Sequence, residues 1–270
     1  MFFDSHTHTA FSFDGDPAAT PLKMCEAALE KGLSGIAFTD HFEANNVVEK
    51  CYPPFDADAA YQSALETKEM FKGRLNVSVG IELGQATEYP DEARALLDTY
   101  KYDFVLGSIH NLPAVPDFYY FRFEVLPDAL IDQLFTRVLI ETEKLCDFEG
   151  IHAVAHLTYM HRYIALASRT LDFTKYKERL ETLFKKMIRK DLALEINVSL
   201  LRRGRALLMP TRELIELYRE NGGSLFTVGS DAHSPLEVGA SISDAYDLLH
   251  SLGVPSVAFY TGGKPTLIPI

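Results

Sequence analysis

The chain alternates short apolar runs with longer stretches in which apolar residues recur at helical spacing. The apolar runs predict strands at Phe2–Asp4, Gly35–Thr39, Asn76–Ile81, Tyr102–Gly107, Ile151–Ala155, Leu192–Ile196, Ser224–Val228 and Ser256–Tyr260. The amphipathic stretches predict helices at Pro17–Lys31, Asp58–Lys72, Pro90–Thr99, Pro127–Phe148, Phe173–Lys190, Thr211–Asn221 and Ile242–Ser251. Strands that alternate with helices in this way form parallel β/α units.

Seven or eight such units favour a closed α/β barrel, with a doubly wound open sheet as the alternative. Nearly every predicted strand ends in a side chain that can bind a metal. An open sheet collects its ligands at one crevice where the strand order reverses. A barrel instead gathers them around the rim formed by the carboxyl ends of its strands. We therefore expect a barrel, built as a single domain over residues 1–270.

Composition excludes several classes of protein. The formal net charge is −12 over 270 residues, which argues against broad nucleic-acid binding because that needs a basic face. No apolar run is long enough for a transmembrane helix, and no secretory signal precedes the first strand. The three cysteines are odd in number and lack CxxC spacing, as expected for reduced thiols. We expect a cytoplasmic protein without nucleic-acid or membrane partners; the oligomeric state is left open.

Two pairs of potential metal ligands mark the ends of the barrel sequence. His6 and His8 are separated by one residue, and so are Asp231 and His233. Because residues i and i+2 of a strand point to the same face, each pair presents two ligands in one direction. Seven of the nine histidines lie at such strand ends or in nearby turns.

Further candidate ligands follow the other strands. The full candidate set is His6, His8, Asp14, His41, Glu82, His110, His156, Asp231 and His233. Any one of them could be structural, but a ring of imidazoles and carboxylates at the same rim is not. Glu82 ends a buried apolar run, where an isolated carboxylate is very costly. His152, His161 and His250 are assigned structural or surface roles.

Six imidazoles and three carboxylates can hold two or three divalent ions. Imidazole and carboxylate together favour Zn, Mn or Fe. Glu82 has the chemistry to bridge two ions, and a bridged pair activates water and stabilises a transferring phosphoryl group.

The order of these motifs resembles the PHP (polymerase and histidinol phosphatase) superfamily. The motifs are HxH, an Asp, Thr-Asp-His, Gly-Ile-Glu, Gly-Ser-Ile-His, Ala-His and Gly-Ser-Asp-Ala-His, between His6 and His233. The resemblance implies a distorted (β/α)7 TIM-like barrel with a trinuclear metal site. One ion would bind His6, His8, Glu82 and Asp231, a second Glu82, His110 and His156, and a third Asp14, His41 and His233.

Length and motifs are most similar to the bacterial histidinol-phosphate phosphatases. The resemblance implies hydrolysis of the phosphomonoester L-histidinol phosphate, in histidine biosynthesis, by a metal-activated hydroxide. One alternative is a related phosphoesterase that acts on another small phosphate, a nucleotide or a phosphotyrosine peptide. A non-catalytic metal-binding domain is a further alternative, but it predicts missing ligands, and none is missing.

Several residues are candidates for work beyond metal binding. Arg162 and Arg202, in segments that resemble the family, are candidates to bind the phosphate, with Arg203 as a register alternative to Arg202. Asp231 and His233 are candidate proton shuttles. An acidic residue is expected to meet the substrate ammonium group; Glu43, Glu88, Asp117 and Glu124 are the candidates. The aromatic segment Phe118–Phe123 is either a lid or substrate wall, or a packed surface loop.

Overall fold

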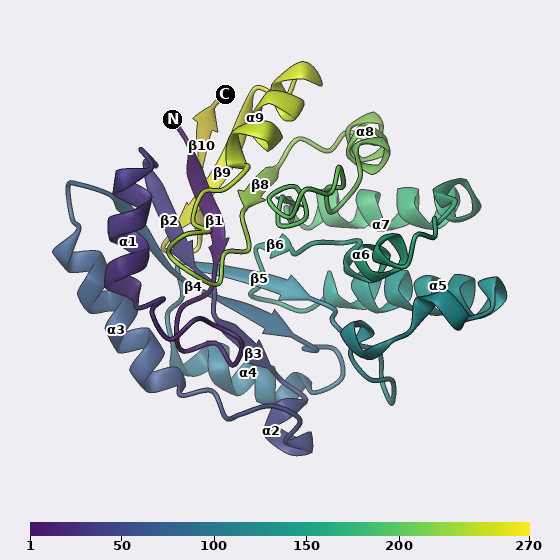
Figure 1. Cartoon of the computed structure of the whole chain (residues 1–270), viewed down its shortest axis with the longest axis horizontal. Helices are drawn as coiled ribbons and strands as arrows, with labels where there is room; N and C mark the ends of the chain where they lie inside the picture. The colour runs from purple at the N-terminus through teal and green to yellow at the C-terminus, as the bar shows by residue number, and fades with distance from the viewer.

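The computed structural model describes all 270 residues and consists of a parallel barrel wrapped by helices (Figure 1). The strands are β1 (Phe3–Thr7), β2 (Gly35–Phe38), β3 (His41–Glu43), β4 (Asn76–Gly84), β5 (Phe104–Ser108), β6 (Ala153–Val154), β7 (Ala193–Asn197), β8 (Phe226–Gly229), β9 (Ser256–Thr261) and β10 (Lys264–Pro269). The helices are α1 (Pro21–Glu30), α2 (Asn46–Glu49), α3 (Ala57–Met70), α4 (Pro90–Thr99), α5 (Asp128–Leu145), α6 (Tyr159–Leu166), α7 (Lys177–Arg189), α8 (Arg212–Glu220) and α9 (Ile242–Ser251). Three 3₁₀ turns occur at Phe118–Tyr120, Phe123–Val125 and Phe173–Tyr176.

Seven parallel strands form the barrel in the order β1-β2-β4-β5-β6-β7-β8, which confirms the predicted α/β barrel. β1 and β8 close the barrel only at their carboxyl ends. There the backbone N–H of His8 donates to Ala232 O at 2.7 Å, and the N–H of Asp231 donates to His6 O at 2.8 Å. Both ligand-bearing segments therefore lie side by side at the closure.

β2 and β3 pair with successive parts of β4 and behave as one interrupted strand. β2 pairs with the first part of β4, and His41 in β3 lies opposite Glu82. At the interruption, the Asp40 carboxylate accepts hydrogen bonds from Thr9 N at 2.6 Å and Ser12 Oγ at 2.8 Å. This buried anchor fixes the loop after β1 against the start of β3.

The predicted eighth barrel strand is not part of the barrel. β9 instead pairs antiparallel with β10 in a two-stranded sheet of its own. Its Phe259 lies 4.8 Å, centroid to centroid, from Phe3, and its Tyr260 lies 4.8 Å from Phe104. Because Phe3 and Phe104 begin their strands, the hairpin covers the amino-terminal end of the barrel, opposite the ligands.

Two outer apolar layers join the barrel to its helices. Residues of α1 and α3, with Ile36, Phe38 and Val79, form one cluster, and a larger one lies under α4 to α9. α1 begins at Pro21 and not at the predicted Pro17, because the Thr20 side chain caps it by accepting from Lys23 N. No helix in the structure combines the length and apolar character that crossing a bilayer requires.

The aromatic segment after β5 is packed and not extended into solvent. Phe118 and Phe123 are buried, whereas Tyr119 and Tyr120 are exposed. Asp117 precedes the first 3₁₀ turn and accepts from Tyr119 N at 2.7 Å. The segment thus forms a wall beside the barrel rim, anchored by its phenylalanines.

Candidate metal centre

All nine predicted ligands come together at the carboxyl ends of the barrel strands. β1 and the loop after it supply His6, His8 and Asp14, β3 and β4 supply His41 and Glu82, and the segments after β5, β6 and β8 supply His110, His156, Asp231 and His233. Seven of the nine are less than one-tenth exposed, and His6, His8 and Glu82 are fully buried. Carboxylates buried in such a cluster need positive charge beside them, which either a bound metal ion or a protonated imidazole can supply.

The first group lies at the barrel closure. His6 Nε2 is 2.9 Å from His8 Nε2 and 3.3 Å from Glu82 Oε2, and His8 Nε2 is 3.3 Å from Asp231 Oδ1. Ligands of one zinc ion, each about 2.0–2.2 Å from it, lie about 3–3.5 Å apart. The four side chains therefore have the spacing of one coordination shell.

The second group uses the other oxygen of Glu82. Glu82 Oε1 is 2.7 Å from His156 Nε2 and 3.1 Å from His110 Nε2, and the two imidazole nitrogens are 3.4 Å apart. Glu82 thus turns Oε2 to the first group and Oε1 to the second, as a bridging carboxylate does.

The third group is the most open. Asp14 Oδ2 lies 3.1 Å from His233 Nε2 and 3.8 Å from His41 Nε2, with the Asp14 side chain 43% exposed. The His8 ring lies between those of His41 and His233, at centroid distances of 4.2 and 4.1 Å. Three groups of potential ligands are therefore contiguous.

Fixed partners orient four of the six imidazoles. The Nδ1 atoms of His6, His8, His110 and His233 face Glu195 Oε1 at 2.5 Å, Ser12 Oγ at 3.2 Å, Glu43 Oε1 at 2.7 Å and Asp231 O at 3.0 Å, respectively. An imidazole whose Nδ1–H donates to such a partner keeps the Nε2 lone pair for a metal. In each case Nε2 points toward the centre.

Glu195 is not among the residues predicted from the sequence, and Glu43 is predicted only as a candidate for the substrate ammonium group; both lie behind the imidazoles and support them. Glu195 also accepts from the backbone N–H of His156 at 2.5 Å, and Glu43 from Gln85 Nε2 at 3.0 Å. A Cβ at Gly229 would clash with His6 and Glu195, and one at Gly84 would clash with Glu43. These two glycines leave room for the supporting carboxylates.

The carboxylates and imidazoles of the centre shift each other's pKa values. Burial alone would raise the pKa of Glu82, but the imidazoles of His41 and His6 outweigh it and hold that pKa well below its ordinary value. Burial, together with the neighbouring His233 and His41, lowers the pKa of His8 well below its ordinary value. Ionised Glu82 and neutral His8 are the forms that bind metals.

The predicted phosphate-binding arginines have different surroundings. Arg202 donates to the backbone carbonyls of Ser230 and, at 2.9 Å, Asp231, and its Nε donates to Glu237 at 3.1 Å. It therefore braces Asp231, whose φ of 55° is left-handed. Arg162 has no ion pair. Arg203 lies on the surface, close enough to Arg162 and Asp231 to interact with their charges.

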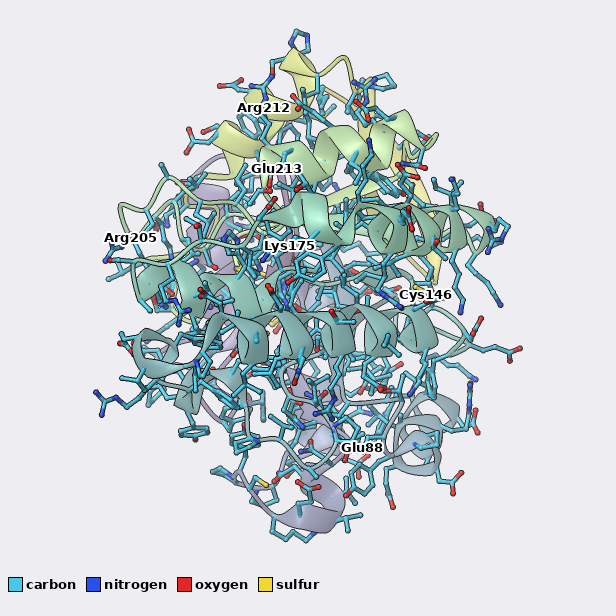
Figure 2. All side chains as sticks on the ribbon, turned by 90° about the vertical axis from the view of Figure 1, so that its right-hand side faces the viewer. Glu88, Cys146, Lys175, Arg205, Arg212 and Glu213 are labelled. Carbon is cyan, nitrogen blue, oxygen red and sulfur yellow. The ribbon has the colours of Figure 1, made fainter.

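A cavity of about 650 Å³ opens beside the third group and is lined by Phe13, His41, Tyr52 and Phe55, among others. Asp117 is half-buried near it, accepting from Tyr159 Oη at 3.2 Å and Tyr52 Oη at 3.4 Å. Of the other acidic candidates, Glu43 is occupied by His110. Glu88 lies close to the negative charges of Glu49 and Glu141 and is labelled in the lower part of the molecule in Figure 2.

A seven-stranded barrel with imidazoles and carboxylates around one rim defines a class of metal-binding α/β barrels. The model of the PHP domain family matches residues 4–199, and the chain belongs to that family.

Relatives of known name are similar over nearly their whole length. The chain is 28% identical over 264 residues to the probable histidinol-phosphatase of Clostridium acetobutylicum, covering 96% of this chain and 97% of that protein. It is 25% identical over 269 residues to the histidinol-phosphatase of Lactococcus lactis, covering 97% and 95%. The crystal structure of histidinol phosphate phosphatase from Lactococcus lactis, complexed with zinc, L-histidinol and phosphate, shares the fold with a TM-score of 0.81 at 22% identity, covering 98% of each chain.

Proposed function

We propose that this protein is a metal-dependent phosphatase that hydrolyses L-histidinol phosphate. The observation that carries the proposal is Glu82, whose two oxygens face two separate groups of imidazole nitrogens. The names of the Clostridium and Lactococcus relatives support the substrate. The single-domain organisation over residues 1–270 belongs to the same proposal. The three cysteines are unpaired, in keeping with the cytoplasm as the proposed compartment.

Three ions fit the three groups of side chains. We assign one to His6, His8, Glu82 and Asp231, a second to Glu82, His110 and His156, and a third to Asp14, His41 and His233. Zn, Mn or Fe suits this set. When bound, such ions supply Lewis acidity and lower the pKa of coordinated water toward neutrality.

The chain's own residues then bind and orient the phosphate. The unpaired Arg162 guanidinium binds phosphate oxygens, and Arg203, near Asp231, is placed to help it. Arg202 has three of its five N–H groups occupied, so it acts mainly by holding Asp231 and reaches phosphate with the remaining two. Asp231 and His233 are the candidates to deliver a proton to the leaving oxygen; the His233 side chain is 24% exposed and that of Asp231 10%.

Asp117 is the acidic residue that we assign to the cationic part of the substrate. It lies near His110, between two tyrosine hydroxyls at the edge of the aromatic cavity. Asp117→Asn should raise KM for L-histidinol phosphate about tenfold, the loss of one charge-assisted hydrogen bond. The same change should leave KM for p-nitrophenyl phosphate, which has no cation, within about twofold. Equal effects on both substrates would remove Asp117 from this role.

The test of the function is phosphate release by metal-loaded protein. We expect kcat/KM for L-histidinol phosphate of about 10⁴ M⁻¹s⁻¹ or more, well above a panel of nucleotides, phosphotyrosine peptide and other phosphomonoesters. Glu82→Ala should release bridged metal and abolish turnover. Preference for another ester would keep the metal chemistry and change the substrate, whereas inactivity with every metal would favour the binding-domain alternative.

A further inference from the structure

A second cavity, of about 300 Å³, lies between α6 and the loop that follows β7, to one side of the metal centre. α6 contributes His161, Arg162 and Leu166 to its lining, and the loop contributes Leu200, Arg205 and Leu207. Arg205 is at its outer rim, labelled at the edge of the molecule in Figure 2. None of these residues except Arg162 belongs to the site described above.

Polar groups in this cavity lack partners. The His161 imidazole is 7% exposed, makes no hydrogen bond, and has a buried Nδ1 without a partner. Nε of Arg162 is also buried and without a partner. An unsatisfied buried donor or acceptor is costly, so these groups are expected to be paired when a ligand is bound.

The charge of the cavity is positive and uncompensated. Arg162 and Arg205 have no ion pair, whereas Arg169, on the same wall, is held by the carbonyls of Phe123 and Leu126 and by Asp128. In a chain with a net charge of −12, two free guanidiniums beside a buried imidazole form a local site for an anion. The leucines supply an apolar wall.

We propose that this cavity binds a small organic anion, a carboxylate or phosphonate on a compact apolar body, which regulates substrate binding. The acidic group pairs with Arg162 and Arg205 and hydrogen-bonds to His161, and the apolar body packs on Leu166, Leu200 and Leu207. The regulatory part rests on the proposed function, since Arg162 also binds the substrate phosphate there. An occupant that holds Arg162 raises KM and leaves kcat unchanged.

The binding test uses benzoate as the probe. Calorimetry measures its binding to the metal-loaded protein. Arg205→Glu should weaken benzoate binding at least about tenfold. Arg212→Glu, at an exposed position of α8 outside the cavity, is the control and should bind benzoate like the wild type. His161→Gln, which alters the buried hydrogen-bonding group, should also weaken benzoate binding, and acetate, which lacks the apolar body, should bind more weakly than benzoate.

A second experiment distinguishes benzoate binding in the cavity from binding at the metal centre. Benzoate binding that survives removal of the metals by chelation supports the cavity, whereas binding that disappears with the metals overturns the proposal. Equal binding by the Arg205 and Arg212 variants, or none by the wild type, also overturns it. In the wild type, benzoate should raise KM for whichever phosphomonoester is turned over; without any phosphatase activity, the binding result stands by itself and the proposed function alone fails.

Discussion

The carboxylate of Glu82 and the imidazoles around it are held in place by a second layer of residues. Glu195 faces His6, and Glu43 faces His110. Such carboxylate–histidine pairs fix the ring orientation and make the imidazole a stronger ligand. Metal affinity at this centre should therefore depend on residues that touch no metal.

Glu195→Gln tests this dependence. The amide can still accept from the His156 N–H, but it carries no charge to pair with His6, so we expect metal affinity to fall about 10- to 100-fold. Competition with a chelator of known affinity measures the change independently of turnover. Glu213→Gln on the exposed face of α8, labelled in Figure 2, is the control. An affinity equal to that of the control would mean that Glu195 only fills space.

His161 predicts a pH dependence of stability. Burial lowers the pKa of His161 from 6.5 to about 4, so the folded state disfavours its protonation. Well above pH 6.5 the imidazole is neutral in both states, so its titration does not change the free energy of unfolding. As the pH falls from 6.5 toward 4, the unfolded state gains the proton first, and folding loses up to about 3 kcal/mol.

His161→Gln should remove that part of the acid sensitivity. Urea unfolding of metal-free wild type and variant at pH 7 and pH 4.5 gives the free energy of unfolding of each, and metal-free protein keeps the ligand histidines equal in both. We expect the variant to lose about 2 kcal/mol less than the wild type over this range. Parallel losses would show that His161 is protonated without cost.

At the residue scale, the sequence predicts the candidate metal ligands better than the residues that support them. Eight of the nine candidate ligands could be chosen because they follow apolar runs, and strand ends converge in a barrel. Asp14 lies in the turn after the first strand and is a candidate because of its place beside His6 and His8. Glu195 carries a comparable signal, a lone carboxylate within the apolar strand β7, yet its partner His6 is 189 residues away. The contacts of Glu43 with His110 and of Arg202 with Asp231 carry no such signal, because they join segments that are distant along the chain.

At the scale of elements, long periodic segments are predicted well and short ones are missed. The helices at Pro90–Thr99 and Ile242–Ser251 have the predicted bounds. β3, α2 and α6 span three, four and eight residues, too few for a periodic signal. β10 contains a Pro near each end of its sequence, and a proline makes a segment a weaker strand candidate.

The β9–β10 hairpin offers an element-scale prediction. Phe259 is 3% exposed and packs against Phe3 at the barrel end remote from the ligands. Phe259→Ala should reduce the free energy of unfolding by about 3–5 kcal/mol, through lost burial and the cavity left behind. Leu267→Ala, at an exposed position of β10, should change it by less than about 0.5 kcal/mol.

The same pair of variants separates stability from chemistry. Below its unfolding temperature, the Phe259 variant should bind metal with wild-type affinity in the chelator assay, because no ligand or supporting carboxylate touches the hairpin. A large loss of metal affinity at full folding would show that the covered end of the barrel positions the opposite rim.

At the scale of the whole molecule, the candidate ligands come from strands that the backbone joins only in part. β1 and β8 pair only at their carboxyl ends, and the first group of candidate ligands spans β1, β4 and the segment after β8. A buried carboxylate, Asp4, adds to the closure by accepting from Ser230 N at 2.9 Å and Gly239 N at 2.8 Å. Bound metal would therefore cross-link the barrel where its hydrogen-bond ladder is weakest.

Removal of metal should lower the thermal stability of the whole barrel. A ligand at about 1,000 times its Kd stabilises the folded state by about 4 kcal/mol per site, and for a chain of this size each kcal/mol corresponds to about 2–4 °C. Chelation should thus lower Tm by about 10 °C or more, and added zinc or manganese should restore it. Calorimetry on both forms measures the difference, with Phe259→Ala as a control that lowers Tm in both forms while keeping their separation. Because ligands come from β1, β3, β4 and the segments after β5, β6 and β8, the metal-free protein should still unfold in one transition. An unchanged Tm after verified metal loss would mean that the barrel closes without help from its centre.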